Sequence, residues 1–119
     1  MSAPVVFIVE DEALIREVIV AEFEDAGFVV TEAEDAETAE RALANGAPCD
    51  LLFTDIRLPG ALDGFDLAER ARELRPELPV IFATGYTAEP VRMVPGSRLF
   101  RKPFSPSELI AAARALGVG

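Results

Sequence analysis

The chain has 119 residues and a net charge of −10 at neutral pH, with 11 basic and 21 acidic side chains. This length fits one domain with a single buried core, so we assign residues 1–119 to one domain. The acidic balance opposes contact with nucleic acid or an anionic membrane surface, and we expect neither as a partner. The lone cysteine, Cys49, cannot form an internal disulfide, and the N-terminus has no secretory pattern, so we expect a cytoplasmic location.

Short apolar runs alternate with helical patterns along the chain, which is typical of an α/β fold with a parallel sheet covered on both faces. The predicted strands are five short segments, at residues 5–9, 28–33, 51–54, 79–83 and 98–101. The predicted helices are four longer segments, at residues 12–26, 36–44, 63–74 and 106–116. Residues 87–97 hold two prolines and a glycine, so the helix expected between the last two strands is short or irregular.

Helical spacing also predicts which side chains face the core. In the first helix the expected apolar face is Leu14, Val18, Ala21 and Phe23. In the helix over 63–74 it is Phe65, Leu67, Ala68, Ala71 and Leu74. Asp63 and Ser105 stand where the side chain of a helix N-cap is needed.

Acidic residues follow two of the predicted strands. Glu10 and Asp11 come after the first, and Asp55 comes at the end of the third. If these strands are neighbours, the three carboxylates meet at one sheet edge, and each pair at about 5 Å repels by about 3 kcal/mol at an effective dielectric near 20. A hard divalent cation relieves this repulsion, and we predict Mg²⁺ held by Glu10, Asp11, Asp55 and the backbone carbonyl of Arg57.

Two further groups are predicted at the same edge of the sheet. The hydroxyl of Thr84 follows the fourth strand, and the ammonium of Lys102 follows the fifth. Acids, a hydroxyl and a lysine together suit phosphoryl transfer, in which Asp55 receives the phosphoryl group while Lys102 and Thr84 bind its oxygens.

Four ordered motifs resemble the receiver domain of two-component response regulators, of the chemotaxis-regulator type. They are Glu10-Asp11, Asp55-Ile56-Arg57-Leu58-Pro59, Thr84-Gly85 and Lys102-Pro103-Phe104. The resemblance implies a flavodoxin-like (βα)5 fold with a doubly wound, five-stranded parallel sheet. It also implies that Asp55 is the phosphoacceptor, that Glu10 and Asp11 are the acid pair, that Thr84 is the switch hydroxyl, and that Lys102 is the invariant-type lysine of the site.

The same resemblance implies a signalling role rather than a turnover enzyme. A histidine kinase or histidine phosphotransfer protein would donate the phosphoryl group, Mg²⁺ would be required, and a downstream protein target would be contacted by a monomer or a weak phosphorylation-dependent dimer. We therefore predict a single-domain response regulator in a two-component system or phosphorelay. The alternative is a receiver domain of a hybrid kinase, acting as a phosphate sink or relay.

The segment at residues 79–87 resembles the FATGUY-type receivers, many of which are stand-alone proteins. It departs from that pattern at Val80, where an aromatic residue is usual, and at Thr87, which replaces a smaller residue. Leu99 stands where many receivers carry a tyrosine or phenylalanine that moves on activation. We therefore predict a switch made of Thr84 and Tyr86, with Leu99 unable to take the usual aromatic role.

Two other functions are weighed against a phosphoacceptor. A haloacid-dehalogenase-like phosphatase also uses an aspartate, Mg²⁺, a hydroxyl and a lysine, but it needs a second aspartate two residues after the nucleophile, where this chain has Arg57. Turnover of a phosphate monoester would identify that enzyme. A degenerate receiver that only binds proteins is disfavoured by the intact set of acids, and failure to bind Mg²⁺ would identify it.

Overall fold

The computed structural model describes residues 3–85 and 92–119. The strands in this part of the chain are β1 (Val5–Val9), β2 (Val29–Ala33), β3 (Leu51–Asp55), β4 (Val80–Thr84) and β5 (Arg98–Arg101). The helices are α1 (Ala13–Asp25), α2 (Ala36–Ala44), α3 (Gly64–Leu74) and α4 (Pro106–Ala115). Each predicted strand and helix agrees with these bounds to within one residue at either end.

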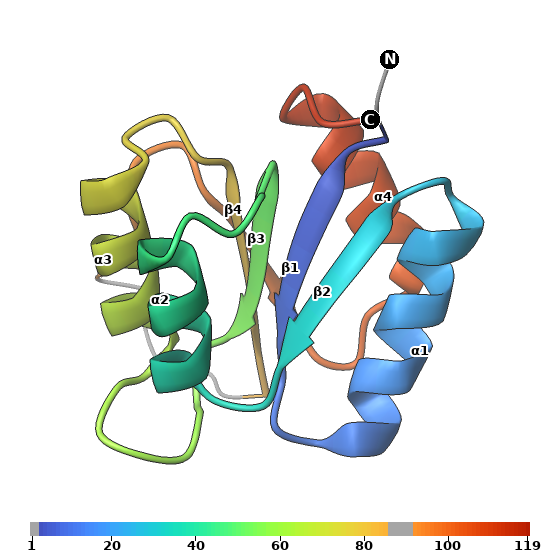
Figure 1. Cartoon of the computed structure of the whole chain (residues 1–119). Helices are drawn as coiled ribbons and strands as arrows, with labels where there is room; N and C mark the ends of the chain where they lie inside the picture. Colours follow the sequence, from blue (N-terminus) through green and yellow to red (C-terminus); the bar gives the residue numbers. More distant parts are fainter. Residues whose placement is uncertain (1–2, 86–91) are drawn as a thin grey trace.

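The strands form one parallel sheet in the order β2-β1-β3-β4-β5. Helices α1 and α4 cover one face, and α2 and α3 cover the other (Figure 1). This is the predicted doubly wound flavodoxin-like arrangement. The chain leaves β1 for the sheet edge at β2 and then returns to β3 on the other side of β1, so the carboxyl ends of β1 and β3 flank a topological switch point.

Side chains alternate between two apolar layers, one on each face of the sheet. From β1, Val6 and Ile8 join the layer under α1 and α4, whereas Phe7 and Val9 join the layer under α2 and α3. All four are at most 1% exposed. Because both faces are buried, β1 is apolar throughout, and β3 and β4 are apolar up to their polar carboxyl ends, which is why their positions could be predicted.

The predicted core face of α1 is largely wrong. Leu14 is 78% exposed and Val18 is 56% exposed, while the buried residues are Ile19 and Phe23, with Ile15 partly buried beside them. Two apolar stripes run along this helix, one through residues 15, 19 and 23 and one through 14 and 18, and the sheet covers only the first. Phe23 belongs to the first stripe and packs edge-to-face against Phe28, at 5.0 Å between ring centroids, which favours burial of that stripe.

Two further expectations about helices meet different outcomes. Asp63 caps α3 in a capping box with Asp66, as predicted. Ser105 occupies the N-cap position of α4, but its side chain makes no capping hydrogen bond and instead lies 2.8 Å from the hydroxyl of Ser107. The sequence predicts Leu74 in the core, but it is 49% exposed, because it lines a surface hollow at the end of α3 together with Glu40 and Ala44 of α2.

Between β4 and β5 the structure describes residue 85 and residues 92–97, which form bends and turns rather than a helix. Arg92 contacts Asp66 and Glu69 on α3, at 2.7 and 2.6 Å. Arg72 on α3 donates to the carbonyl of Pro95, at 2.8 Å. The described part of this connection is therefore held against α3, and the rest of the expected fourth helix lies outside the described residues.

Candidate functional site

The candidate site lies at the carboxyl ends of β1 and β3, at the switch point of the sheet. Glu10 and Asp11 follow β1 directly, and Asp55 is the last residue of β3. Helix α3 begins very close to this edge, since a side chain at Gly64 would place its Cβ 2.2 Å from the backbone oxygen of Asp55. A glycine at this position lets the chain turn back immediately behind the phosphoacceptor candidate.

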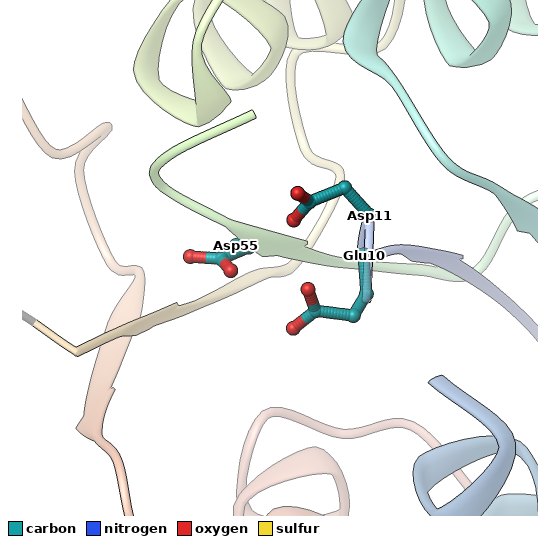
Figure 2. Close-up of side chains that lie close together, drawn as sticks. All are labelled: Glu10, Asp11 and Asp55. Atoms are coloured by element: carbon teal, nitrogen blue, oxygen red, sulfur yellow. The ribbon is translucent and has the colours of Figure 1, made fainter. Parts of the chain in front are cut away.

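The three carboxyl groups gather at one point, as the sequence predicted, and we call Glu10, Asp11 and Asp55 the acid cluster (Figure 2). One oxygen from each residue lies within 4.8 Å of the others. Glu10 is fully buried and Asp55 is 5% exposed, whereas Asp11 is open to solvent. The cluster is thus a partly buried acidic site with one exposed side.

The ammonium of Lys102 reaches two members of the acid cluster. It lies 2.8 Å from Oε1 of Glu10 and 2.9 Å from Oδ2 of Asp55. Desolvation opposes its charge, but the hydrogen bonds with Glu10 and Asp55 outweigh this effect and raise the pKa of Lys102 above its ordinary value. Lys102 therefore remains a cation and offsets part of the negative charge of the site.

The donor set fits a hard divalent cation. Partial desolvation of its carboxyl group and a hydrogen bond with Glu10 raise the pKa of Asp11 above its ordinary value. The negative charge of Glu10 also raises the pKa of Asp11, by more than the positive charge of Lys102 lowers it. The lysine therefore leaves repulsion between the acids, which a cation at the exposed side would relieve. Carboxylate oxygens with room for retained waters are the ligands that Mg²⁺ prefers.

The remaining predicted site residues lie around the same edge. The backbone N–H of Arg57 donates to Oδ1 of Asp55 at 3.3 Å, so the peptide bond between Ile56 and Arg57 lies beside the acid cluster. Thr84 is buried, at 4% exposure, and its carbonyl accepts the N–H of Lys102 at 2.8 Å. Leu99 is half-buried on β5, paired with Phe82 of β4. Tyr86 lies outside the described residues.

One residue that the sequence analysis missed supports the turn after β1. Arg16, on α1, donates to the backbone oxygen of Glu10 at 2.6 Å and to Oε1 of Glu32 at 3.0 Å. Its side chain is 17% exposed. It thereby joins the turn that carries Glu10 to the end of β2. The sequence around Arg16 does not indicate this role, because an arginine within an amphipathic helix is usually expected to point into solvent.

Comparison with known proteins places this geometry in a family. The family model described as "Response regulator receiver domain" matches residues 6–114, which include the whole acid cluster, Thr84 and Lys102. The chain belongs to the response regulator receiver domain family. The resemblance noted from the four motifs is thereby confirmed, and so is the function of the family, two-component signalling.

Individual relatives differ in how much of their length this chain covers. The chain is 36% identical to the phosphate regulon transcriptional regulatory protein PhoB of Pseudomonas aeruginosa, over 98% of this chain and 52% of PhoB. It is 34% identical to the response regulator receiver protein CpdR of Brucella abortus, over 88% of this chain and 89% of CpdR. The chain thus spans about half of PhoB and nearly all of CpdR.

Solved receiver structures have the same fold. A response regulator receiver protein from Sinorhizobium medicae is 34% identical and matches with a TM-score of 0.92, covering 96% of this chain and 94% of that one. The receiver domain of the hybrid histidine kinase CckA is 31% identical, with a TM-score of 0.79 over 94% of this chain and 97% of that one. In the described part of this receiver, no helix is long and apolar enough to span a membrane.

Proposed function

We propose that this receiver domain accepts a phosphoryl group on Asp55 from a histidine kinase or a histidine phosphotransfer protein. The observation that carries the proposal is the contact between Lys102 and Asp55 of the acid cluster, at 2.9 Å, next to the exposed carboxylate of Asp11. A carboxylate at the carboxyl end of a parallel strand, with one cation beside it, is placed to receive a phosphoryl group and to have its product charge balanced.

In the proposed step an oxygen of Asp55 attacks the phosphorus of a phosphohistidine. The new O–P bond forms as the N–P bond breaks, and the departing imidazole nitrogen keeps the bonding electron pair and takes a proton from solvent. Lys102 exchanges its contact with the Asp55 carboxylate for one with a phosphoryl oxygen, and the Thr84 hydroxyl donates to another. Later attack by water on phosphorus releases inorganic phosphate and regenerates the carboxylate.

Mg²⁺ is the cofactor in this proposal, held by Glu10, Asp11, Asp55 and the backbone carbonyl of Arg57. When bound, it would supply positive charge to the acids and to a phosphoryl oxygen. The chain's own residues then hold and orient the reacting groups: Glu10 is fixed by the N–H of Glu12 on its Oε2, at 3.1 Å.

The output in this proposal is a change in protein contacts, not turnover of a substrate, and the protein acts in the cytoplasm as a monomer or weak phosphorylation-dependent dimer. Thr84 would move toward the phosphoryl group, and Tyr86 would carry the change to a downstream protein target. The position of Thr84 supports its part: it is buried at the end of β4, and its carbonyl accepts the N–H of Lys102.

An apolar groove beside the site supports contact with a protein donor. It is lined by exposed residues of α1 and by the segment after β5, namely Leu14, Val18, Lys102, Pro103, Phe104 and Pro106. Since Lys102 also contacts Asp55, a protein bound in this groove would have its phosphohistidine next to the acceptor. We propose the phosphohistidine-bearing domain of the donor as the occupant of this groove.

A receiver that is part of a larger protein is the second candidate. One observation favours it: the chain is similar in structure to the receiver of a hybrid histidine kinase. In that setting the same Asp55 chemistry would serve as a phosphate sink or relay. Phosphotransfer profiling separates the two, because a relay receiver would also return its phosphoryl group to a histidine phosphotransfer protein.

The proposal is tested by labelling the Asp55→Asn variant with a cognate kinase in the presence of Mg²⁺. We expect the parent to take up acid-stable, base-labile label and the variant to take up none. Asp25→Asn, which changes an exposed acid at the end of α1, is the matched control and should label like the parent. Equal labelling of Asp55→Asn would place the acceptor elsewhere.

A further inference from the structure

The loop at residues 56–63 connects β3 to α3 and carries the Arg57 carbonyl that is proposed to complete the Mg²⁺ site. Its two ends are fixed near the acid cluster. At the start, the N–H of Arg57 donates to Asp55 at 3.3 Å, and at the end, the N–H of Gly64 donates to the carbonyl of Ile56 at 2.7 Å. The middle of the loop needs a separate support, because a loop of this length can move while its ends stay in place.

Glu37 provides that support from outside the loop. It lies in the first turn of α2, and its Oε2 accepts the backbone N–H groups of Ala61, at 2.9 Å, and Leu62, at 3.3 Å. These partners are 24 and 25 residues away in the sequence. Its other oxygen, Oε1, is buried and has no hydrogen-bond partner among the described residues. Within the described residues, the hydrogen bonds of this carboxyl group are therefore all with the loop.

The loop backbone is shaped to receive this carboxyl group. Gly60 has a φ of +95°, in the left-handed region that favours glycine, and a Cβ at this position would lie 2.7 Å from Oε2 of Glu37. No residue with a side chain fits here without moving Glu37 or the loop. The close approach and the two hydrogen bonds thus specify one another.

Helix α2 does not itself require Glu37. Its N-terminus is already capped by Asp35, whose side chain accepts the N–H of Thr38 at 2.7 Å. A glutamate in the first turn also suits the helix dipole, but that interaction does not require both amide contacts or a buried oxygen. The observed contacts point to a role in the loop instead.

We propose that Glu37 is a positioning residue of the phosphorylation site, which holds the loop at residues 56–63 so that the Arg57 carbonyl faces the acid cluster. This inference rests on the proposed function, since it concerns Mg²⁺ binding before phosphoryl transfer. Losing Glu37 leaves two backbone N–H groups without their acceptor, and the loop relaxes toward water. The acid cluster keeps its carboxylates but loses a fixed fourth oxygen.

The experiment compares Glu37→Ala and Glu37→Gln with the parent, using two readouts. Hydrogen exchange of the Ala61 and Leu62 amides is measured in the metal-free protein, and the Mg²⁺ dissociation constant is measured by titration calorimetry. For Glu37→Ala we expect faster exchange at both amides and a dissociation constant raised about tenfold, which corresponds to about 1.4 kcal/mol. Glu37→Gln keeps an acceptor oxygen and should stay within about threefold of the parent.

Glu40→Ala is the matched control. Glu40 lies one turn further along α2 and contacts Arg70 of α3, at 2.9 Å, rather than the loop. The control should weaken the packing of the two helices while leaving the Mg²⁺ dissociation constant and the exchange of the Ala61 and Leu62 amides unchanged. A loss of Mg²⁺ affinity in Glu40→Ala as large as in Glu37→Ala would show a general stability effect and overturn the proposal.

The remaining outcomes separate this inference from the proposed function. If the parent and Glu37→Ala bind Mg²⁺ equally well, Glu37 has no positioning role, whatever its effect on hydrogen exchange. If the parent itself neither binds Mg²⁺ nor becomes labelled on Asp55, the proposed function fails and this inference fails with it. Should Glu37→Ala not fold, Glu37→Leu takes its place, because leucine keeps much of the side-chain volume but has no acceptor oxygen: a dissociation constant about tenfold above that of the parent would support the role of Glu37, and a parent-like one would contradict it.

Discussion

Lys102 and Glu10 form an ion pair 92 residues apart in sequence, with 2.8 Å between Nζ and Oε1, and the glutamate is fully buried. The same ammonium reaches Asp55. One lysine thus offsets charge on both the phosphoacceptor candidate and an acid that no solvent reaches. It occupies the oxygens that a metal ion or a phosphoryl group would otherwise engage, so its removal should have opposite effects on stability and on cation binding.

We predict that Lys102→Met lowers the stability of the metal-free protein and tightens its binding of Mg²⁺. Breaking a fully buried pair costs about 3–5 kcal/mol, and since Lys102 is partly exposed we expect about 1–3 kcal/mol. Urea unfolding in a chelator measures the first effect. Calorimetric titration measures the second, and we expect about a threefold or greater fall in the dissociation constant. Lys102→Arg, which keeps the charge, should show neither effect at full size.

Mg²⁺ is predicted to stabilise the folded protein through the acid cluster. It binds a site that the unfolded chain lacks, and a ligand at 100 times its dissociation constant adds about 2.7 kcal/mol. This should raise the melting temperature by several degrees. In Asp11→Ala the exposed ligand is lost, and the shift should largely disappear. A variant that responded to Mg²⁺ like the parent would show that the cation binds somewhere other than the acid cluster.

The strands and the acid cluster could be predicted because they follow from local patterns and one rule of topology. Buried parallel strands are continuous apolar runs, and residues after adjacent strands meet at one sheet edge, which brought Glu10, Asp11 and Asp55 together. The core face of α1 could not be predicted in the same way. Leu14 and Ile15 both belong to apolar stripes with helical spacing, and only packing against the sheet decides between them.

The residues that support the site from neighbouring elements could not be predicted from the sequence either. Arg16 and Glu37 bind backbone atoms of other segments. Every residue type carries a backbone carbonyl and nearly every one an N–H, so the identity of the partner residue does not reveal such a contact. In Glu37 the partners lie more than 20 residues away, beyond any helical or strand period. Gly60 was the one visible signal, since a glycine in a loop marks a possible positive φ, but it does not name the residue that approaches it.

Cys49 is predicted to be unreactive in the folded protein. Partial burial raises the pKa of its thiol from an ordinary value of 9.0 to about 11. Near pH 8 the thiolate fraction, and so the rate with iodoacetamide, should be about 100-fold lower than in the urea-unfolded chain. The unfolded thiol ionises first as the pH rises, so the contribution of Cys49 to stability is intact below about pH 9 and is lost between there and about 11. Equal rates in the folded and unfolded protein would contradict this.

The last prediction concerns the groove beside Lys102, which Leu14 lines with a side chain that is 78% exposed. We expect Leu14→Ser to slow phosphotransfer from a protein donor about tenfold, because an exposed apolar contact near the acceptor is lost, while Mg²⁺ affinity stays at the parent value. Folding stability should change little, since this side chain is largely in solvent in the free protein.

Leu74→Ser is the matched control: it changes the same residue type, 49% exposed, at the end of α3 on the opposite face of the sheet, and should transfer like the parent. Rates are measured with a phosphorylated histidine phosphotransfer domain or kinase and with acetyl phosphate, which needs no groove. A parent-like rate of Leu14→Ser with the protein donor, or an equal loss with acetyl phosphate, would remove the groove from the phosphotransfer step.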